Sequence, residues 1–92
     1  MLRVRSDRLT WRSVGGEVIA LDLETSTYFS TNRSGAVLWT ELVEGRTHAQ
    51  LVDTLRRRFE ITFERAAADV DEFLAGLAAN GLLEQPRRHA AG

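Results

Sequence analysis

The order of the expected elements predicts an α+β domain in which a three-stranded antiparallel sheet precedes three helices. Two observations lead to this fold class. Between residues 9 and 31 apolar and polar residues alternate, as they do along half-buried strands. From residue 32 onward apolar residues instead recur every three or four positions, as on one face of a helix, and glycines or polar turn residues separate the segments.

The three strands are expected in the first third of the chain. Residues 9–14 alternate in polarity, and Gly15-Gly16 is a hairpin signal because both glycines accept positive φ. Residues 17–23 have apolar side chains on both faces, so this strand is expected in the centre of the sheet. Thr27 to Thr31 is rich in β-branched and aromatic residues and is expected at an edge. The shared faces are Leu9, Trp11 and Ser13; Val18 and Ala20; and Ile19, Leu21 and Leu23.

The helices are delimited by capping residues. Asn32 is a good N-cap for the first helix, and Gly45 is a typical C-terminal stop. Thr47-His48-Ala49-Gln50 is a capping box that opens the second helix. A third helix is expected from about Phe63 to Asn80, with Leu82 and Leu83 folding back on the core. The apolar stripes of the three helices comprise Val37, Leu38, Trp39, Leu42 and Val43; Leu51, Val52, Leu55 and Phe59; and Ala66, Val70, Phe73, Leu74 and Leu77. Trp11 of the first strand is expected to join Trp39 as a core anchor.

Length and composition favour one folded domain. The chain has 92 residues, 43% of them hydrophobic and 27% charged, which suits a single core. We expect residues 1–84 to form this domain and residues 85–92 to be a disordered tail. With no cysteine, no apolar run long enough for a membrane span and no signal peptide, a cytoplasmic location is expected. All 12 basic residues are arginine, which is typical of a GC-rich bacterial genome.

The third strand and the third helix form the candidate binding site. Residues Thr27, Tyr28, Phe29, Ser30 and Thr31 include no charge and no proline, so nothing in this edge strand repels a peptide that adds to the sheet by β-augmentation. If the third helix lies alongside, its apolar residues can floor a groove for peptide side chains. They are Val70, Phe73, Leu74 and Leu77, and Asp69 on the helix flank can meet a polar or cationic group. Simple core packing of the apolar residues is the alternative.

Catalytic and metal sites are not expected. His48 and His89 have no second histidine at ligand spacing, and no cysteine completes a metal site. No cofactor motif is present, because Gly15-Gly16 is too short for a phosphate loop. The third helix has four acidic residues against Arg65, the wrong sign for DNA phosphates, so a winged-helix DNA-binding regulator is the less favoured alternative of another class. Arg56-Arg57-Arg58 fan around a helix and are expected to be solvated, as are Asp71 and Glu72.

Taken in order, several short motifs resemble the PqqD-like family, the peptide-binding domains called RiPP recognition elements. The resemblance spans roughly Leu9 to Leu83. It rests on Tyr28-Phe29, Asn32, Gly35 and Leu38-Trp39, on the Gly45-Arg46-Thr47 turn, and on Asp69-Val70, Phe73-Leu74, Leu77 and Gly81-Leu82-Leu83. One departure is Thr31, where a leucine often precedes the asparagine of the family.

This resemblance implies a winged-helix-like fold that binds the leader peptide of a ribosomally made precursor as an additional antiparallel strand. It also implies a protein without catalytic activity or cofactor, which presents the precursor to a modifying enzyme. A lasso-peptide pathway is favoured, with a cysteine-protease-type leader peptidase and a lasso cyclase as partners and with no nucleic acid or membrane involved. The alternative within the family is the peptide chaperone of pyrroloquinoline-quinone synthesis, whose partner is a radical-SAM enzyme.

Overall fold

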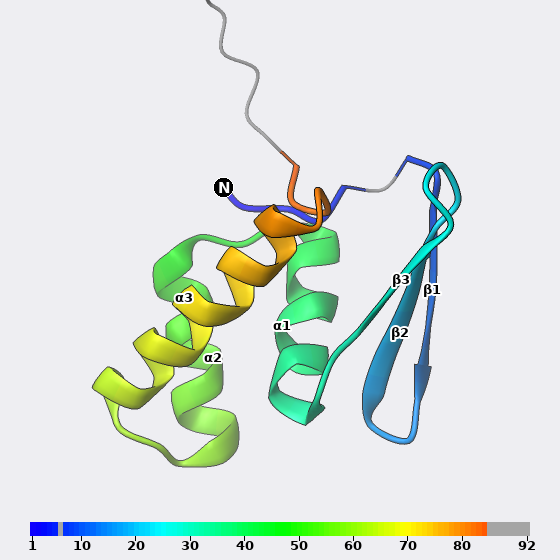
Figure 1. The fold of residues 1–92 in the computed structure, drawn as a ribbon. Helices are drawn as coiled ribbons and strands as arrows, with labels where there is room; N and C mark the ends of the chain where they lie inside the picture. Colours follow the sequence, from blue (N-terminus) through cyan, green and yellow to red (C-terminus); the bar gives the residue numbers. More distant parts are fainter. Residues whose placement is uncertain (6, 85–92) are drawn as a thin grey trace, which may run out of the picture.

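A computed structural model of the chain describes residues 1–5 and 7–84. It confirms the predicted class, because three antiparallel strands precede three helices (Figure 1). The expected tail at residues 85–92 lies outside the described residues. The elements are β1 (Leu9–Val14), β2 (Glu17–Asp22), β3 (Thr27–Ser30), α1 (Arg33–Glu44), α2 (His48–Phe59) and α3 (Phe63–Ala79).

The sheet has the order β1-β2-β3, so β2 is central and β3 is an edge strand, as predicted. Gly15 and Gly16 form the β1–β2 turn with φ of 61° and 82°. Of the two faces predicted for β2, the one with Val18 and Ala20 is fully buried. We call this the inner face, and the register places Phe29 of β3 on it, beside Ala20.

Helix α1 lies against the inner face, between the sheet and α2 (Figure 1). Its N-cap is Asn32, whose side-chain oxygen accepts a hydrogen bond from the Gly35 amide at 2.9 Å. Gly45 follows its last residue with φ of 97°, a conformation that suits glycine. Thr47 and Gln50 form the predicted capping box of α2, and therefore both of these helices begin where local sequence signals place them.

The core lies where α1 meets the sheet, α2 and α3. Trp39 is fully buried, and its ring contacts those of Trp11 and Phe29, each with ring centroids 6.0 Å apart. Three side chains expected in the core are more open than predicted. Trp11 lies on the edge strand β1, Val43 near the end of α1, and Phe59 in the last turn of α2. Each of the three residues keeps 38% of its surface exposed. In each case an element's edge or end leaves one side of the side chain without a packing partner.

The N-terminal segment closes the structure at the end of α1. Leu2 forms an isolated bridge with Arg46, and Val4 with Leu83, so the segment runs between the α1–α2 connection and the residues after α3. Leu82 is 2% exposed, which confirms that the chain folds back on the core after α3. The first residues of the chain are therefore part of the packed domain.

Candidate functional site

Along the edge of β3 that faces away from β2, backbone groups at alternate residues have no partner among the described residues. In the β2–β3 ladder the Thr31 amide donates to the Val18 carbonyl at 3.0 Å, which identifies this pair as a hydrogen-bonded one. Hydrogen-bonded and non-bonded pairs alternate along antiparallel strands, so Phe29 also points its backbone groups toward β2. The N–H and C=O groups of Tyr28 and Ser30 therefore face away from β2, toward the open edge.

The side chains of β3 do not block this edge. Tyr28 is 70% exposed, and Ser30 is exposed as well, whereas Phe29 is half-buried on the inner face. Strand β3 carries neither a charged residue nor a proline, the two usual ways in which a natural edge strand resists pairing. An extended peptide can therefore pair with β3 without removing a charge from water.

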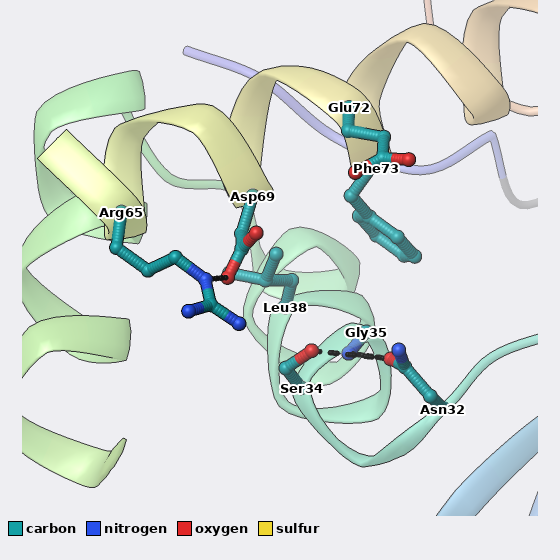
Figure 2. A pocket seen from close by; sticks show the side chains of 8 residues that line it. All are labelled: Asn32, Ser34, Gly35, Leu38, Arg65, Asp69, Glu72 and Phe73. Carbon is teal, nitrogen blue, oxygen red and sulfur yellow. Dashed lines mark hydrogen bonds and ion pairs between the residues drawn. The ribbon is translucent and has the colours of Figure 1, made fainter. Parts of the chain in front are cut away.

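A hollow of about 250 Å³ lies between the first turns of α1 and the middle of α3. Figure 2 shows the residues from both helices that line it: Asn32, Ser34, Leu38 and the backbone of Gly35 from α1 and its N-cap, and Arg65, Asp69, Glu72 and Phe73 from α3. A second hollow of about 480 Å³ shares Asn32, Ser34, Arg65 and Asp69 with the first and extends to Phe59 and Ile61. We call the two together the α1–α3 groove.

The position of Phe73 depends on the absence of a side chain at Gly35. A Cβ built on Gly35 would lie 3.0 Å from Cε1 of Phe73 and 3.0 Å from Cβ of Thr31, closer than ordinary van der Waals contact. The Phe73 ring also contacts the Phe29 ring, with centroids 6.2 Å apart. Phe29 and Phe73 thus connect the edge strand to the α1–α3 groove, and the absence of a side chain at Gly35 leaves room for the Phe73 ring against α1.

Charges at the groove come mainly from α3. Arg65 and Asp69 form an ion pair one helical turn apart, with Nε and Oδ2 separated by 3.5 Å, and Glu72 adds a second carboxylate (Figure 2). The Asp69 side chain retains 34% of its surface exposed, so the pair is partly solvated and can exchange partners at small cost. The groove therefore combines apolar side chains, among them Phe73, Leu38 and Phe59, with carboxylates that can accept hydrogen bonds from a polar or cationic ligand.

Asp22 holds the chain at the start of β3. Its carboxylate is 6% exposed and accepts hydrogen bonds from the Glu24 amide at 2.9 Å and from Nη2 of Arg5 at 3.0 Å. Burial raises the pKa of Asp22, but hydrogen bonds from the Glu24 and Thr25 amides and from Arg5 outweigh this effect. The result is a pKa below the ordinary value of 3.8. The sequence reasoning missed this residue because its partner Arg5 lies far away in the chain.

The structure places three of the predicted site residues at the groove or in contact with a residue that lines it. Phe73 and Asp69 line it, Phe29 contacts Phe73, and Leu74 is half-buried on α3. Val70 and Leu77 are 0% exposed. The prediction that these two line a groove surface is therefore corrected: they pack in the core beneath it.

Other residues at the groove were not predicted. Ser34, Leu38, Arg65 and Glu72 line the first hollow, although Glu72 was expected only to be solvated. The N-cap at Asn32 could have indicated the two residues of α1, Ser34 and Leu38, because both lie in the first two turns of the helix that it starts. The sequence alone did not indicate that α1 lies next to α3.

Thr31 explains how the chain accommodates its departure from the family pattern. Its side chain is 9% exposed, and its hydroxyl oxygen accepts a hydrogen bond from the fully buried Val18 amide at 3.0 Å. The Thr31 amide in turn donates to the Val18 carbonyl. The second bond is between backbone groups and does not depend on the side chain, but the bond from the Val18 amide needs the threonine hydroxyl, and a leucine side chain has no acceptor to offer there.

The other sites considered from the sequence were the histidines and the arginine cluster of α2. His48 contacts Asp71 at 2.6 Å between α2 and α3, but within residues 1–5 and 7–84 no group of three potential metal ligands gathers. Arg56, Arg57 and Arg58 are exposed, as predicted, and Arg57 pairs with Asp53 in its own helix. None of the helices described is both long and apolar enough to cross a membrane.

Comparison with known proteins gives similarity over most of the chain. A family model described as "Coenzyme PQQ synthesis protein D (PqqD)" matches residues 17–83. A solved structure of TbiB1 in complex with the TbiA(beta) leader peptide is 29% identical, with a TM-score of 0.82 over 94% of this chain and 99% of that chain. A lasso peptide synthetase B1 complexed with the leader peptide is 20% identical, with a TM-score of 0.79 over 91% of this chain and 98% of that chain, and it supports the fold alone. No curated protein matches the chain.

Proposed function

This chain belongs to the PqqD family, and from that premise we propose that it binds the leader peptide of a ribosomally made precursor in lasso-peptide biosynthesis. The observation that carries the proposal is the uncharged, unpaired edge of β3 beside the α1–α3 groove. The similarity to TbiB1, whose structure contains a leader peptide, supports the same ligand class. In the proposed complex the leader adds to the sheet as a fourth, antiparallel strand next to β3.

The expected affinity follows from a small number of contacts. Each backbone hydrogen bond to Tyr28 or Ser30 contributes about 1 kcal/mol, and each buried apolar anchor about 2 kcal/mol. Association and ordering of the peptide cost several kcal/mol in the other direction. Four such bonds with three anchors amount to about 10 kcal/mol before this cost is subtracted, so we expect a Kd of about 1 µM or weaker, and the anchors decide how far it lies from that value.

The anchors are expected between β3 and α3. Phe73 is the apolar surface most directly available, with Leu74 half-buried beside it in sequence and Asp69 placed to meet a polar or cationic leader group. Val70 and Leu77 support this surface from the core and need not touch the peptide. Backbone pairing to residues 27–31 supplies affinity that depends little on leader sequence, whereas the anchors supply specificity.

The test is a titration with a synthetic peptide that spans the leader of a candidate precursor, which is sought as a short reading frame beside this gene. Amide NMR shifts should concentrate in β3 and α3, and Phe73→Ala should weaken binding by about 1 to 3 kcal/mol. Phe63→Ala is the matched control, because Phe63 starts the same helix, is 59% exposed and lines a different hollow with His48 and Val52. Shifts centred on Arg56 to Arg58, or equal effects of the two variants, would contradict the proposal.

In the pathway the protein is proposed to assist without catalysing. It presents the bound precursor to a cysteine-protease-type leader peptidase, and then to a lasso cyclase, in the cytoplasm. Its addition should lower the apparent KM of the peptidase for the full precursor by raising the local substrate concentration. For a substrate whose leader is truncated, its addition should leave the KM unchanged. Mass spectrometry of precursor incubated with this protein alone should show no covalent change; a cleavage that persists after repurification would refute a purely binding role.

The name of the matching family model favours one second candidate, a peptide chaperone in pyrroloquinoline-quinone synthesis. Both candidates use the same edge of β3 and differ in the enzyme that receives the peptide. Co-purification separates them: a leader peptidase retained in the presence of leader supports the lasso pathway, whereas a retained radical-SAM enzyme supports the second candidate.

A further inference from the structure

One face of the sheet has no covering layer among the described residues. Helix α1 packs on the inner face, and Figure 1 shows no helix against the opposite, outer face. Apolar side chains nevertheless lie on it: Ile19 is 39% exposed, Val14 48% and Tyr28 70%. Of these three, only Tyr28 lies on β3, the strand whose edge is open.

The backbone of Tyr28 and its side chain face two different surfaces. Its N–H and C=O point to the open edge, because the hydrogen-bonded pairs of β3 with β2 fall on Phe29 and Thr31. Its side chain lies on the outer face beside Leu21, with which it forms a non-hydrogen-bonded pair, the closer type of cross-strand neighbour. The Tyr28 side chain therefore lies next to the open edge of β3, on the face of the sheet opposite to the one that carries Phe29 and faces Phe73.

A fourth antiparallel strand would have its side chains sorted by this register. The leader residue opposite Tyr28 receives both of the outward backbone bonds of Tyr28, and its side chain falls on the outer face next to the phenol ring. The leader residue opposite Phe29 has its side chain on the inner face, toward Phe73. Successive leader residues thus alternate between two separate surfaces of this protein.

We propose that Tyr28 is a specificity-determining residue that contacts an apolar leader side chain on the outer face of the sheet, so that the leader is recognised on both of its faces. This inference rests on the proposed leader binding and adds to it a second contact surface. The leader residue opposite Tyr28 is aromatic or branched aliphatic, because it lies against an aromatic ring with Leu21 behind it. It is not proline, since it must donate its own N–H to the Tyr28 carbonyl.

The first experiment compares variants of two exposed residues on the same face. Fluorescence anisotropy with the labelled leader peptide measures Kd for wild type, Tyr28→Thr, Tyr28→Phe and Val14→Thr. Val14 is the matched control because it is an exposed apolar residue on β1, at the opposite edge of the sheet. We expect Tyr28→Thr to raise Kd about three- to fivefold, while Tyr28→Phe and Val14→Thr stay within about 1.5-fold. Equal Kd values for Tyr28→Thr and wild type would overturn the inference.

The second experiment maps the leader by substituting each position in turn with alanine and with proline. Leader positions at which alanine raises Kd should form two alternating sets. At positions of the first, the Tyr28 set, alanine should raise Kd less for Tyr28→Thr than for wild type. At positions of the second, alanine should raise Kd less for Phe73→Ala, and double-mutant cycles measure both couplings. Proline should abolish binding at positions of the Tyr28 set and be tolerated at the position opposite Phe29. A single set coupled only to Phe73 would refute recognition on the outer face.

The outcomes also separate this inference from the function on which it rests. If the wild-type protein does not bind the leader at all, the proposed function fails. If it binds with the contacts of Phe73 but without those of Tyr28, only this inference fails. Tighter leader binding by Tyr28→Thr, together with loss of a dimer in sedimentation, would assign Tyr28 to pairing between two copies of the chain and would likewise overturn it.

Discussion

A glycine-to-alanine exchange at Gly35 tests the packing that positions the groove. The added Cβ would lie 3.0 Å from Phe73 Cε1, 3.0 Å from Thr31 Cβ and 3.2 Å from Asn32 Oδ1. Thr31 is held by two hydrogen bonds to Val18, so the Phe73 ring must yield instead. Overpacking of this kind costs about 1–3 kcal/mol, and the better helix propensity of alanine offsets at most about 1 kcal/mol of it.

The expected result for Gly35→Ala is a loss of about 0.5–2 kcal/mol in the free energy of unfolding, together with weaker leader binding because Phe73 is displaced. Gly76→Ala is the matched control. Gly76 also lies within a helix, α3, but a Cβ there meets nothing within 4 Å. This variant should gain about 0.4–1 kcal/mol, since alanine restricts the unfolded chain.

Urea unfolding followed by circular dichroism measures both changes, and anisotropy with the leader peptide measures the affinity. The two variants should move the stability in opposite directions. If Gly35→Ala stabilises the protein as Gly76→Ala does, and binds the leader as wild type does, then the close contact between the Phe73 ring and Gly35 does not position Phe73.

Two further predictions concern the hydrogen bonds that hold β3. Thr31→Val keeps the side-chain shape but leaves the buried Val18 amide without its acceptor, so urea unfolding should show a loss of about 1–3 kcal/mol in the free energy of unfolding. Thr31→Ser retains the hydroxyl and should lose clearly less. Equal losses for the two variants would argue against the hydrogen bond. The lowered pKa of Asp22 predicts a contribution to stability that is complete above the ordinary value of 3.8 and is lost as pH falls through the folded-state pKa. Wild type should therefore be more stable than Asp22→Asn at pH 6, with the difference shrinking below pH 3.8; a difference independent of pH would contradict this cause.

Local signals in the sequence were sufficient for the elements and their order. Asn32, the Thr47–Gln50 capping box and Gly45 set the ends of helices through interactions within a few residues, and the alternation in β2 set its two faces. The edge position of β3 also followed from sequence, because a meander of consecutive strands leaves the last one paired on one side only.

What the tertiary structure decided is which side chains remain available at the surface. Val70, Phe73, Leu74 and Leu77 share one apolar stripe in the sequence, yet two of them are 0% exposed and two are half-buried. The difference arises because α3 packs mainly against α2, which covers only part of that stripe, while the Phe73 ring lies against the backbone of Gly35 in α1. Helical periodicity gives the direction of a side chain from its own axis, but burial depends on the distance and angle of the neighbouring elements.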